Sequence, residues 1–384
     1  MQIDLALHFK SNSYKLSLIM SAIDRRTFLG LLSGAAAFGL AGRSNLLAFS
    51  TQSSPFRMLV IGDSLIWGQG LLEKDKTYSH VANWLQNDVF KGKREVDVKV
   101  KAHSGATIEI DPKEAESLKA AKVDPAIEYK GEVNIGFPSM WQQIEKASSE
   151  YGSNGADLIL LTAGITDITV EGVLDPFGKD AELRTITAET CGKRVSELLT
   201  HLGAANPNAT IIVIGYYPII SKRSRASRVF NGWLESRNIS SFLKPILNNK
   251  LTRPLFFSRI RKKVIRRSQI WLEELNKHLR NSVDAKVGSM KAVFVTSPLT
   301  EENAVEAPNT KLFRMKPNGD IEDPLFADRT ADCAAVLNDL NSKAKLKYRP
   351  SRCAMAAVGH PDANGAAAYA EAVKSALAPL FTVM

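Results

Sequence analysis

The strongest constraint on the fold is an alternation, from residue 54 onward, of short apolar runs with longer helical periods. Such alternation is typical of a parallel sheet whose strands are joined by crossover helices. Most runs are uniformly apolar, as expected for strands covered on both faces. The predicted strands are residues 58–61, 96–102, 157–162, 210–214 and 292–295. The predicted helices are residues 78–90, 140–149, 183–202, 268–283 and 364–380. We therefore expect one doubly wound α/β domain over residues 55–384.

The first fifty residues are typical of an export signal. Arg25 and Arg26 form a twin-arginine pattern, and residues 28–40 are a run of Phe, Leu, Gly, Ala and Ser that is too short to span a bilayer. The alternative is a buried helix in which the arginine pair is incidental. We assign residues 1–50 to a signal peptide and leader, which predicts a bacterial protein that works in the periplasm or is secreted.

Positive charge is concentrated in one segment. Residues 221–280 contain 16 Lys and Arg against three acids, whereas the whole chain has 50 basic and 40 acidic residues. Pro245 and Pro254 are expected to break this segment into short pieces. We interpret residues 221–270 as a basic insertion, either a solvated surface packed by its aromatics or a cap that attracts an anionic membrane or glycan surface. Nucleic acid is not expected as a partner, because the chain has no nucleic-acid-binding motif.

Chemically useful residues follow the predicted strands. Gly62-Asp63-Ser64-Leu65 comes after the first strand, Gly105 lies in the loop after the second, residues 163–167 follow the third, and His360 precedes the last helix. Ligands in open α/β sheets bind beyond the carboxyl ends of the strands, so these segments are predicted to converge. A hydroxyl, an imidazole and backbone donors together favour acyl transfer. The G-x-S-x-G, H-E-x-x-H and P-loop patterns are all absent from the sequence.

These segments resemble the four sequence blocks of the SGNH or GDSL-type hydrolases. The resemblance implies a three-layer α/β/α, flavodoxin-like fold with a parallel central sheet and with no metal or organic cofactor. It also implies hydrolysis of carboxylic esters through an acyl-enzyme, on a small-molecule, lipid or acylated-glycan substrate. Ser64 would be the nucleophile, His360 the general base, and the backbone N–H groups of Ser64 and Gly105 would line the oxyanion hole. Lipase-like action would predict a lid near Phe256 and Phe257, whereas carbohydrate deacetylation would predict an open groove.

Two positions depart from the family pattern. Thr166 stands where the family has an asparagine, so a shorter hydroxyl would have to complete the oxyanion hole. Ala357 stands where the family usually has the aspartate of the triad. His360 is therefore oriented either by a backbone carbonyl or by a carboxylate from elsewhere.

The cysteines suggest where such a carboxylate would come from. Cys333 and Cys353 are twenty positions apart, and a disulfide between them would stabilise the fold by about 3 kcal/mol in the loop-entropy model. It would also bring Asp328 or Asp332 close to His360, unless both acids are solvated loop residues. Cys191 is expected to be an unpaired, buried residue.

The alternative to an enzyme is a non-catalytic module of the same fold that binds anionic envelope polymers or lipid surfaces through the basic insertion. The presence of both Ser64 and His360 favours the hydrolase, because a binding module needs neither.

Overall fold

The computed structural model describes residues 54–152, 155–225, 252–316 and 321–381, except for the side chains of residues 252–257. The twin-arginine segment, most of the basic insertion and the side chains of Phe256 and Phe257 lie outside the described residues. Export, the anionic partner surface and the lid therefore remain predictions.

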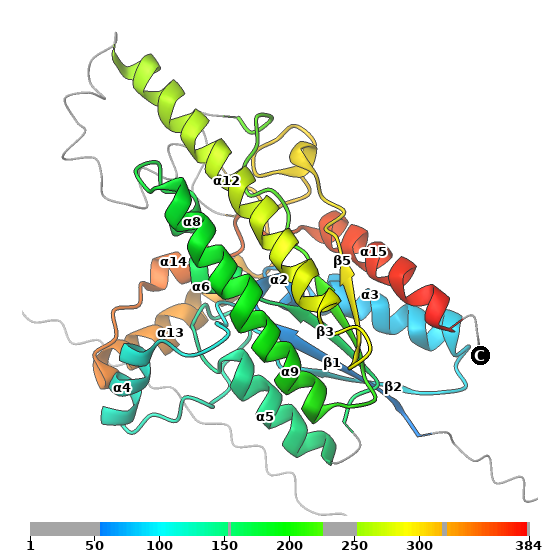
Figure 1. Cartoon of the computed structure of the whole chain (residues 1–384). Helices are drawn as coiled ribbons and strands as arrows, with labels where there is room; N and C mark the ends of the chain where they lie inside the picture. The colour runs from blue at the N-terminus through cyan, green and yellow to red at the C-terminus, as the bar shows by residue number, and fades with distance from the viewer. Residues whose placement is uncertain (1–53, 153–154, 226–251, 317–320, 382–384) are drawn as a thin grey trace, which may run out of the picture. The chain divides into compact units, whose positions relative to one another are not determined.

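The centre of the molecule is a five-stranded parallel sheet with the strand order β2-β1-β3-β4-β5 (Figure 1). Its strands are β1 (Phe56–Gly62), β2 (Val96–Val100), β3 (Leu158–Thr162), β4 (Thr210–Ile214) and β5 (Lys291–Val295). The three inner strands are almost wholly buried, whereas the edge strands β2 and β5 are partly exposed. β2 reads Val-Asp-Val-Lys-Val, the alternation expected of an edge strand that is covered less completely. The predicted parallel α/β sheet is confirmed.

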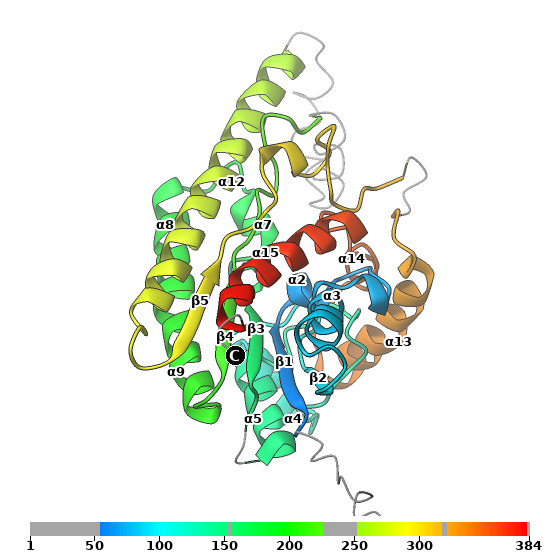
Figure 2. The same ribbon diagram turned by 90° about the vertical axis from the view of Figure 1, so that its right-hand side faces the viewer.

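Helices cover both faces of this sheet and form the outer two of three layers. The helices that form these layers are α3 (Thr77–Trp84), α5 (Met140–Tyr151), α9 (Val195–Ala205), α12 (Thr252–Asp284) and α15 (Ala363–Phe381). α3 and α15 pack together on one face, and α5, α9 and α12 lie on the other (Figures 1 and 2). This is the three-layer α/β/α arrangement that the sequence predicts. Among the described residues, no helix combines the length and apolarity that crossing a membrane requires.

Shorter helices connect these layers. They are α2 (Ser64–Trp67), α4 (Pro112–Ala120), α6 (Ile165–Ile168), α7 (Val170–Val173), α8 (Asp180–Thr187) and α14 (Pro350–Ala354). Two 3₁₀ turns, η1 (Glu73–Asp75) and η5 (Glu301–Asn303), and two π-helical stretches, η2 (Leu85–Val89) and η4 (Ala188–Arg194), complete the connections. The helix predicted at 183–202 is thus a continuous run of α8, η4 and α9.

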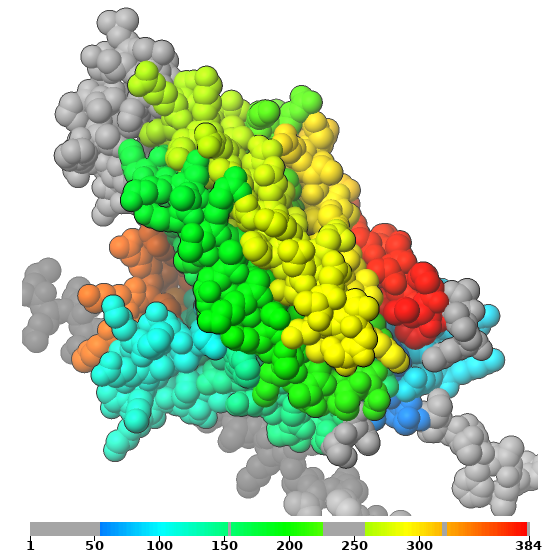
Figure 3. Space-filling model, in the orientation of Figure 1, coloured from blue at the N-terminus to red at the C-terminus, as the bar shows by residue number. Residues whose placement is uncertain are grey.

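α12 is longer than the sequence predicts. It begins at Thr252, and Pro254 lies in its first turn, where a missing backbone N–H costs no intrahelical hydrogen bond. The prediction that Pro254 breaks the segment is therefore wrong. In the space-filling view, α12 lies against α8 along the surface (Figure 3).

Part of the charge of the basic insertion is neutralised within the fold. Lys263, Arg266 and Arg267 of α12 all lie within 3.5 Å of the Asp180 carboxylate at the start of α8. These three residues fasten α12 to α8 and do not form a free cationic surface.

A nineteen-residue helix, α13 (Phe326–Ala344), occupies a segment for which no helix was predicted. Its buried face is Arg329, Cys333, Leu337, Leu340 and Ala344. α13 packs against α14, which leads to the segment that carries His360.

Candidate active site

Ser64 begins α2, directly after β1. Gly62 ends the strand with φ +136°, and a Cβ atom there would lie 2.3 Å from the carbonyl oxygen of Thr162. Only glycine therefore allows the chain to turn this close to β3. The side-chain amide of Gln143 on α5 forms two hydrogen bonds with Gly62. Its oxygen accepts from Gly62 N (2.9 Å), and its nitrogen donates to Gly62 O (3.2 Å). Ser64 is consequently held at the carboxyl end of the sheet.

Asp63 fixes the first turn of α2. Its buried carboxylate accepts hydrogen bonds from the backbone N–H of Leu65 (3.0 Å), from Thr162 Oγ1 (2.8 Å) and from the hydroxyl of Tyr216. Burial raises its pKa, although these three donors each oppose that shift. Tyr216 comes directly after β4, so Asp63 joins the ends of β1, β3 and β4.

The imidazole of His360 lies beside Ser64. His360 Nε2 is 2.7 Å from Ser64 Oγ, although 296 positions separate the two residues. Phe313 pairs with the His360 segment, since its N–H donates to His360 O (2.8 Å) and its carbonyl accepts from Gly359 N (3.0 Å). The hydroxyl of Tyr217 also donates to Gly359 O (2.7 Å). This short segment is thus fixed on two sides.

The other ring nitrogen, Nδ1, faces backbone. The carbonyl groups of Ala356 and Ala357 raise the pKa of His360, but burial outweighs them, and the charge of Arg329 lowers the pKa further, to about 4. Nδ1 forms no well-aligned hydrogen bond with any described residue. An imidazole in this environment is neutral at pH 7, the state in which it can accept a proton from Ser64.

Neither acid proposed from the cysteine spacing reaches His360. Asp332 pairs with Lys130 instead, at 2.7 Å, and Asp328 is exposed on α13. Both residues lie on the outer face of this helix. The interpretation of Asp328 or Asp332 as the orienting acid is therefore not supported by the geometry.

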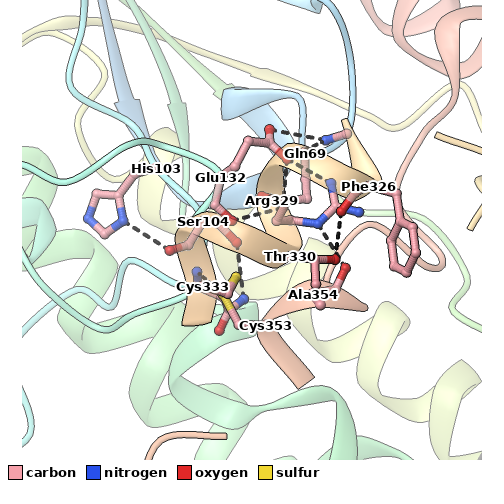
Figure 4. The surroundings of a disulfide bond; sticks show 12 residues. Gln69, His103, Ser104, Glu132, Phe326, Arg329, Thr330, Cys333, Cys353 and Ala354 are labelled. Atoms are coloured by element: carbon pink, nitrogen blue, oxygen red, sulfur yellow. Dashed lines mark hydrogen bonds and ion pairs between the residues drawn. A yellow bond between two sulfur atoms is a disulfide. The ribbon is translucent and has the colours of Figure 1, made fainter. Parts of the chain in front are cut away.

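The disulfide between Cys333 and Cys353 is confirmed, with a Cα–Cα distance of 5.8 Å (Figure 4). Cys191 is free and buried, as predicted. The residue that the disulfide holds close to the His360 segment is Arg329, whose Nε donates to the carbonyl oxygen of Ala354 (2.9 Å). The charged side chain of α13 that lies near the His360 segment is therefore the Arg329 cation, where Asp328 or Asp332 was expected.

Gly105 lies in the loop after β2. Its φ is +82°, and a Cβ atom there would lie 2.7 Å from both the nitrogen and the oxygen of Ile135. The N–H of His103 donates to Gly62 O (3.3 Å), which places this loop next to the end of β1. Among the described residues, no hydrogen bond uses the N–H of Ser64 or of Gly105. Both groups are available as donors.

Thr166 is directed at the backbone. Its Oγ1 donates to Ala106 O at 2.5 Å, which uses the only proton of the hydroxyl. The expected role of Thr166 as an oxyanion donor is therefore replaced by a hydrogen bond that holds the Gly105 loop. The neighbouring Asp167 accepts from the N–H of Ile108 (3.2 Å) and pairs with Arg194 (3.1 Å), and burial raises its pKa to about 6.

Sequence reasoning missed the residues that support the Ser64–His360 pair. Tyr216, Glu132 and Arg329 carry no motif, and each touches the site from a different part of the chain. For Arg329 the one available signal is a polar residue within an otherwise apolar helical face. Glu132 and Tyr216 lie outside helices and have no such signal. The described residues contain no cluster of His, Cys, Asp and Glu that could hold a metal ion.

Comparisons by sequence find no family model and no curated protein that matches this chain. The fold is similar to an extracellular lipase from Streptomyces rimosus (TM-score 0.44, 11% identity, covering 83% of this chain and 99% of that one). It is also similar to phospholipase A1 from Streptomyces albidoflavus NA297 (TM-score 0.41, 12% identity, 84% and 99% coverage). A third similar structure is a family 3 carbohydrate esterase from Clostridium thermocellum (TM-score 0.35, 13% identity, 86% and 98% coverage). At these identities and TM-scores, the likenesses do not decide what this chain does.

Proposed function

We propose that this protein is an SGNH-type serine hydrolase that cleaves carboxylic esters. The observation that carries the proposal is the distance of 2.7 Å between Ser64 Oγ and His360 Nε2 at the carboxyl end of a parallel sheet. A nucleophile and a base at hydrogen-bond distance are the minimum that acyl transfer needs. A binding module would have no use for a half-buried imidazole aimed at a serine.

The proposed reaction has two half-reactions. Ser64 Oγ attacks the ester carbonyl carbon while His360 Nε2 takes the hydroxyl proton, and the same proton then passes to the departing alcohol. The backbone N–H groups of Ser64 and Gly105 would stabilise the negative oxygen of the tetrahedral intermediate. Water then attacks the acyl-enzyme with His360 again as the base, which releases the acid and restores Ser64.

In this proposal His360 works without a carboxylate partner. The carbonyl oxygens of Ala356 and Ala357 would favour a proton on Nδ1, which leaves Nε2 free to accept the proton of Ser64. The substrate would be an ester of a small alcohol, a lipid or an acylated glycan. Secretion or a periplasmic location follows from the twin-arginine segment alone and remains a prediction.

A fluorophosphonate probe tests the proposal, because it reacts only with an activated serine. We expect labelling of the wild-type protein at Ser64, no labelling of Ser64→Ala, and a rate at least about 10³-fold lower in His360→Ala. Ser79→Ala and His80→Ala, two neighbours on α3, are matched controls that should label at the wild-type rate. Peptide mapping locates the label. Folded wild-type protein that takes up no probe and hydrolyses no p-nitrophenyl ester would contradict the proposal and favour the binding module.

A further inference from the structure

Three buried charged residues lie behind the catalytic pair. Arg329 is fully buried, and Asp323 and Glu132 are 6% and 9% exposed. The guanidinium donates to Asp323 with both terminal nitrogens (3.0 and 2.7 Å). It also donates to Glu132 Oε2 (2.9 Å), and Figure 4 shows these two side chains next to each other. Desolvating three charges costs free energy that their mutual attraction often only balances. Stability alone therefore does not explain the arrangement.

Glu132 binds the chain that follows Ser64. Its carboxylate accepts hydrogen bonds from Trp67 Nε1 (2.9 Å), Gln69 Nε2 (3.0 Å) and the backbone N–H of Gly70 (3.1 Å). Trp67 ends α2, the helix that Ser64 begins, so one carboxylate holds both the end of this helix and the turn after it.

Arg329 binds the chain that leads to His360. Its Nε donates to Ala354 O, six residues before the histidine, and Ala354 follows Cys353 of the disulfide. Cys333, the other half of the disulfide, lies one helical turn after Arg329 on the same face of α13. The two segments also meet directly, because a Cβ atom at Gly70 would lie 2.8 Å from the Cβ of Ala357.

We propose that Glu132, Asp323 and Arg329 form a positioning cluster that fixes the nucleophile segment against the base segment and so sets the Ser64–His360 geometry. This inference rests on the proposed function. The hydrogen bonds run from Trp67 through Glu132 and Arg329 to Ala354, and Asp323 holds the guanidinium in plane. None of the three side chains touches the reacting atoms.

The positioning cluster also acts on His360 electrostatically. The Arg329 charge lowers the pKa of the imidazole. The Glu132 and Asp323 carboxylates, which contact the guanidinium, are expected to offset part of that charge. Among the described residues, the other groups around His360 and the positioning cluster include the Ser64 hydroxyl, the carbonyls of Ala356 and Ala357, the phenols of Tyr217 and Tyr78, the buried Asp63, and Lys76, which faces Glu132. Removing Arg329 should therefore raise the pKa of His360, and neutralising Glu132 should lower it.

The pH dependence of kcat/KM separates positioning from a merely structural role. In the wild type the acidic limb is expected near pH 4. In Arg329→Gln the limb should move to higher pH, and in Glu132→Gln to lower pH, each by about half a unit or more. In both variants kcat should fall by about 10-fold or more, because the two segments are no longer tied. Circular dichroism at each pH confirms that the measured protein is folded.

Matched controls exist on the same helix. Lys343→Gln and Asp339→Asn make the same charge changes in an exposed ion pair of α13 and should leave kcat and the acidic limb unchanged. If Arg329→Gln does not fold, Arg329→Lys keeps the charge but cannot hold Asp323, Glu132 and Ala354 together. The kcat of Arg329→Lys should fall, while the acidic limb of its kcat/KM profile stays near pH 4.

Two results would overturn the inference. One is a folded Glu132→Gln variant whose kcat and acidic limb equal those of the wild type. The other is an Arg329→Lys variant whose kcat equals that of the wild type. Both would leave the proposed function intact, provided that the probe labels Ser64 in the wild type. Failure of wild-type labelling would instead remove the proposed function itself.

Discussion

One hydroxyl proton determines what Thr166 contributes to the site. It is donated to Ala106 O, one residue beyond Gly105, and the next residue, Asp167, accepts the N–H of Ile108. The loop after β3 therefore holds the loop after β2 at two positions just beyond Gly105. In this chain the oxyanion would be bound by backbone N–H groups whose position depends on these two side chains.

Thr166→Val tests that dependence. Valine keeps the shape of threonine but leaves Ala106 O without its donor, so we expect the free energy of unfolding to fall by about 1 kcal/mol. We also expect kcat to fall by roughly 10-fold, because the Gly105 N–H is less well placed. Urea unfolding and initial rates with a p-nitrophenyl ester measure the two effects. Thr166→Ser, which retains the hydroxyl, should behave like the wild type, and equal losses in both variants would refute the role.

At the scale of elements, α12 depends on one buried guanidinium. Arg267 donates to Val173 O (3.0 Å) and Gly172 O (2.9 Å), near the carboxyl end of α7, where the helix leaves carbonyl groups unsatisfied. The same side chain lies 3.5 Å from Asp180 of α8. Arg267 thus ties three helices together, whereas its neighbour Arg266 meets Asp180 from the solvent side.

Because Arg267 is buried and Arg266 is exposed, we expect substitution of Arg267 to destabilise the protein much more than substitution of Arg266. Arg267→Met should lower the free energy of unfolding by about 2–4 kcal/mol, because it leaves the carbonyl oxygens of Gly172 and Val173 without their donor and removes a buried charge from beside Asp180. Arg266→Met should change it by less than about 1 kcal/mol, since the side chain of Arg266 is 70% exposed. Urea titration of both variants provides the comparison. Equal decreases in the free energy of unfolding for the two variants would contradict the stabilising role of the buried Arg267 contacts.

The disulfide joins α13 to α14 and closes a separation of 20 residues. Reduction should lower the free energy of unfolding by about 3 kcal/mol, because the unfolded chain regains the entropy of the open loop. It should also lower kcat, since Arg329 and Ala354 lose their covalent brace. The double variant Cys333→Ala/Cys353→Ala serves as the control and should not respond to reductant. A reductant effect of the same size in the control would point to another cause.

For the whole molecule, the strands were the most predictable feature. β4 occupies the predicted residues 210–214, and the other four strands differ from prediction by at most two residues at either end. The reason is that each inner strand is a continuous apolar run that must be buried on both faces. Because parallel strands end at one edge, the same pattern predicts that Ser64 and the loop with Gly105 lie near each other. His360 follows no strand, and its place there was predicted from the turn before the last helix.

What could not be predicted depends on contacts between distant segments. The buried face of α13 begins with an arginine, so the helix does not read as amphipathic from the sequence. Burial of Arg329 is made tolerable by Glu132, Asp323 and the Ala354 carbonyl, which lie outside the helix. The direction of the Thr166 hydroxyl likewise depends on Ala106, sixty positions away. Contacts of this kind cannot be predicted from the local periodicity of the sequence.

The long interval between Ser64 and His360 has a consequence for biosynthesis. The ribosome makes Ser64 early and His360 296 residues later, and α15, the helix after His360, must then dock beside α3. During most of translation the nascent chain therefore carries Ser64 without the imidazole of His360. In the proposed enzyme, a polypeptide released early would be inert toward esters, and reactivity would arise only once the two distant stretches of chain have come together.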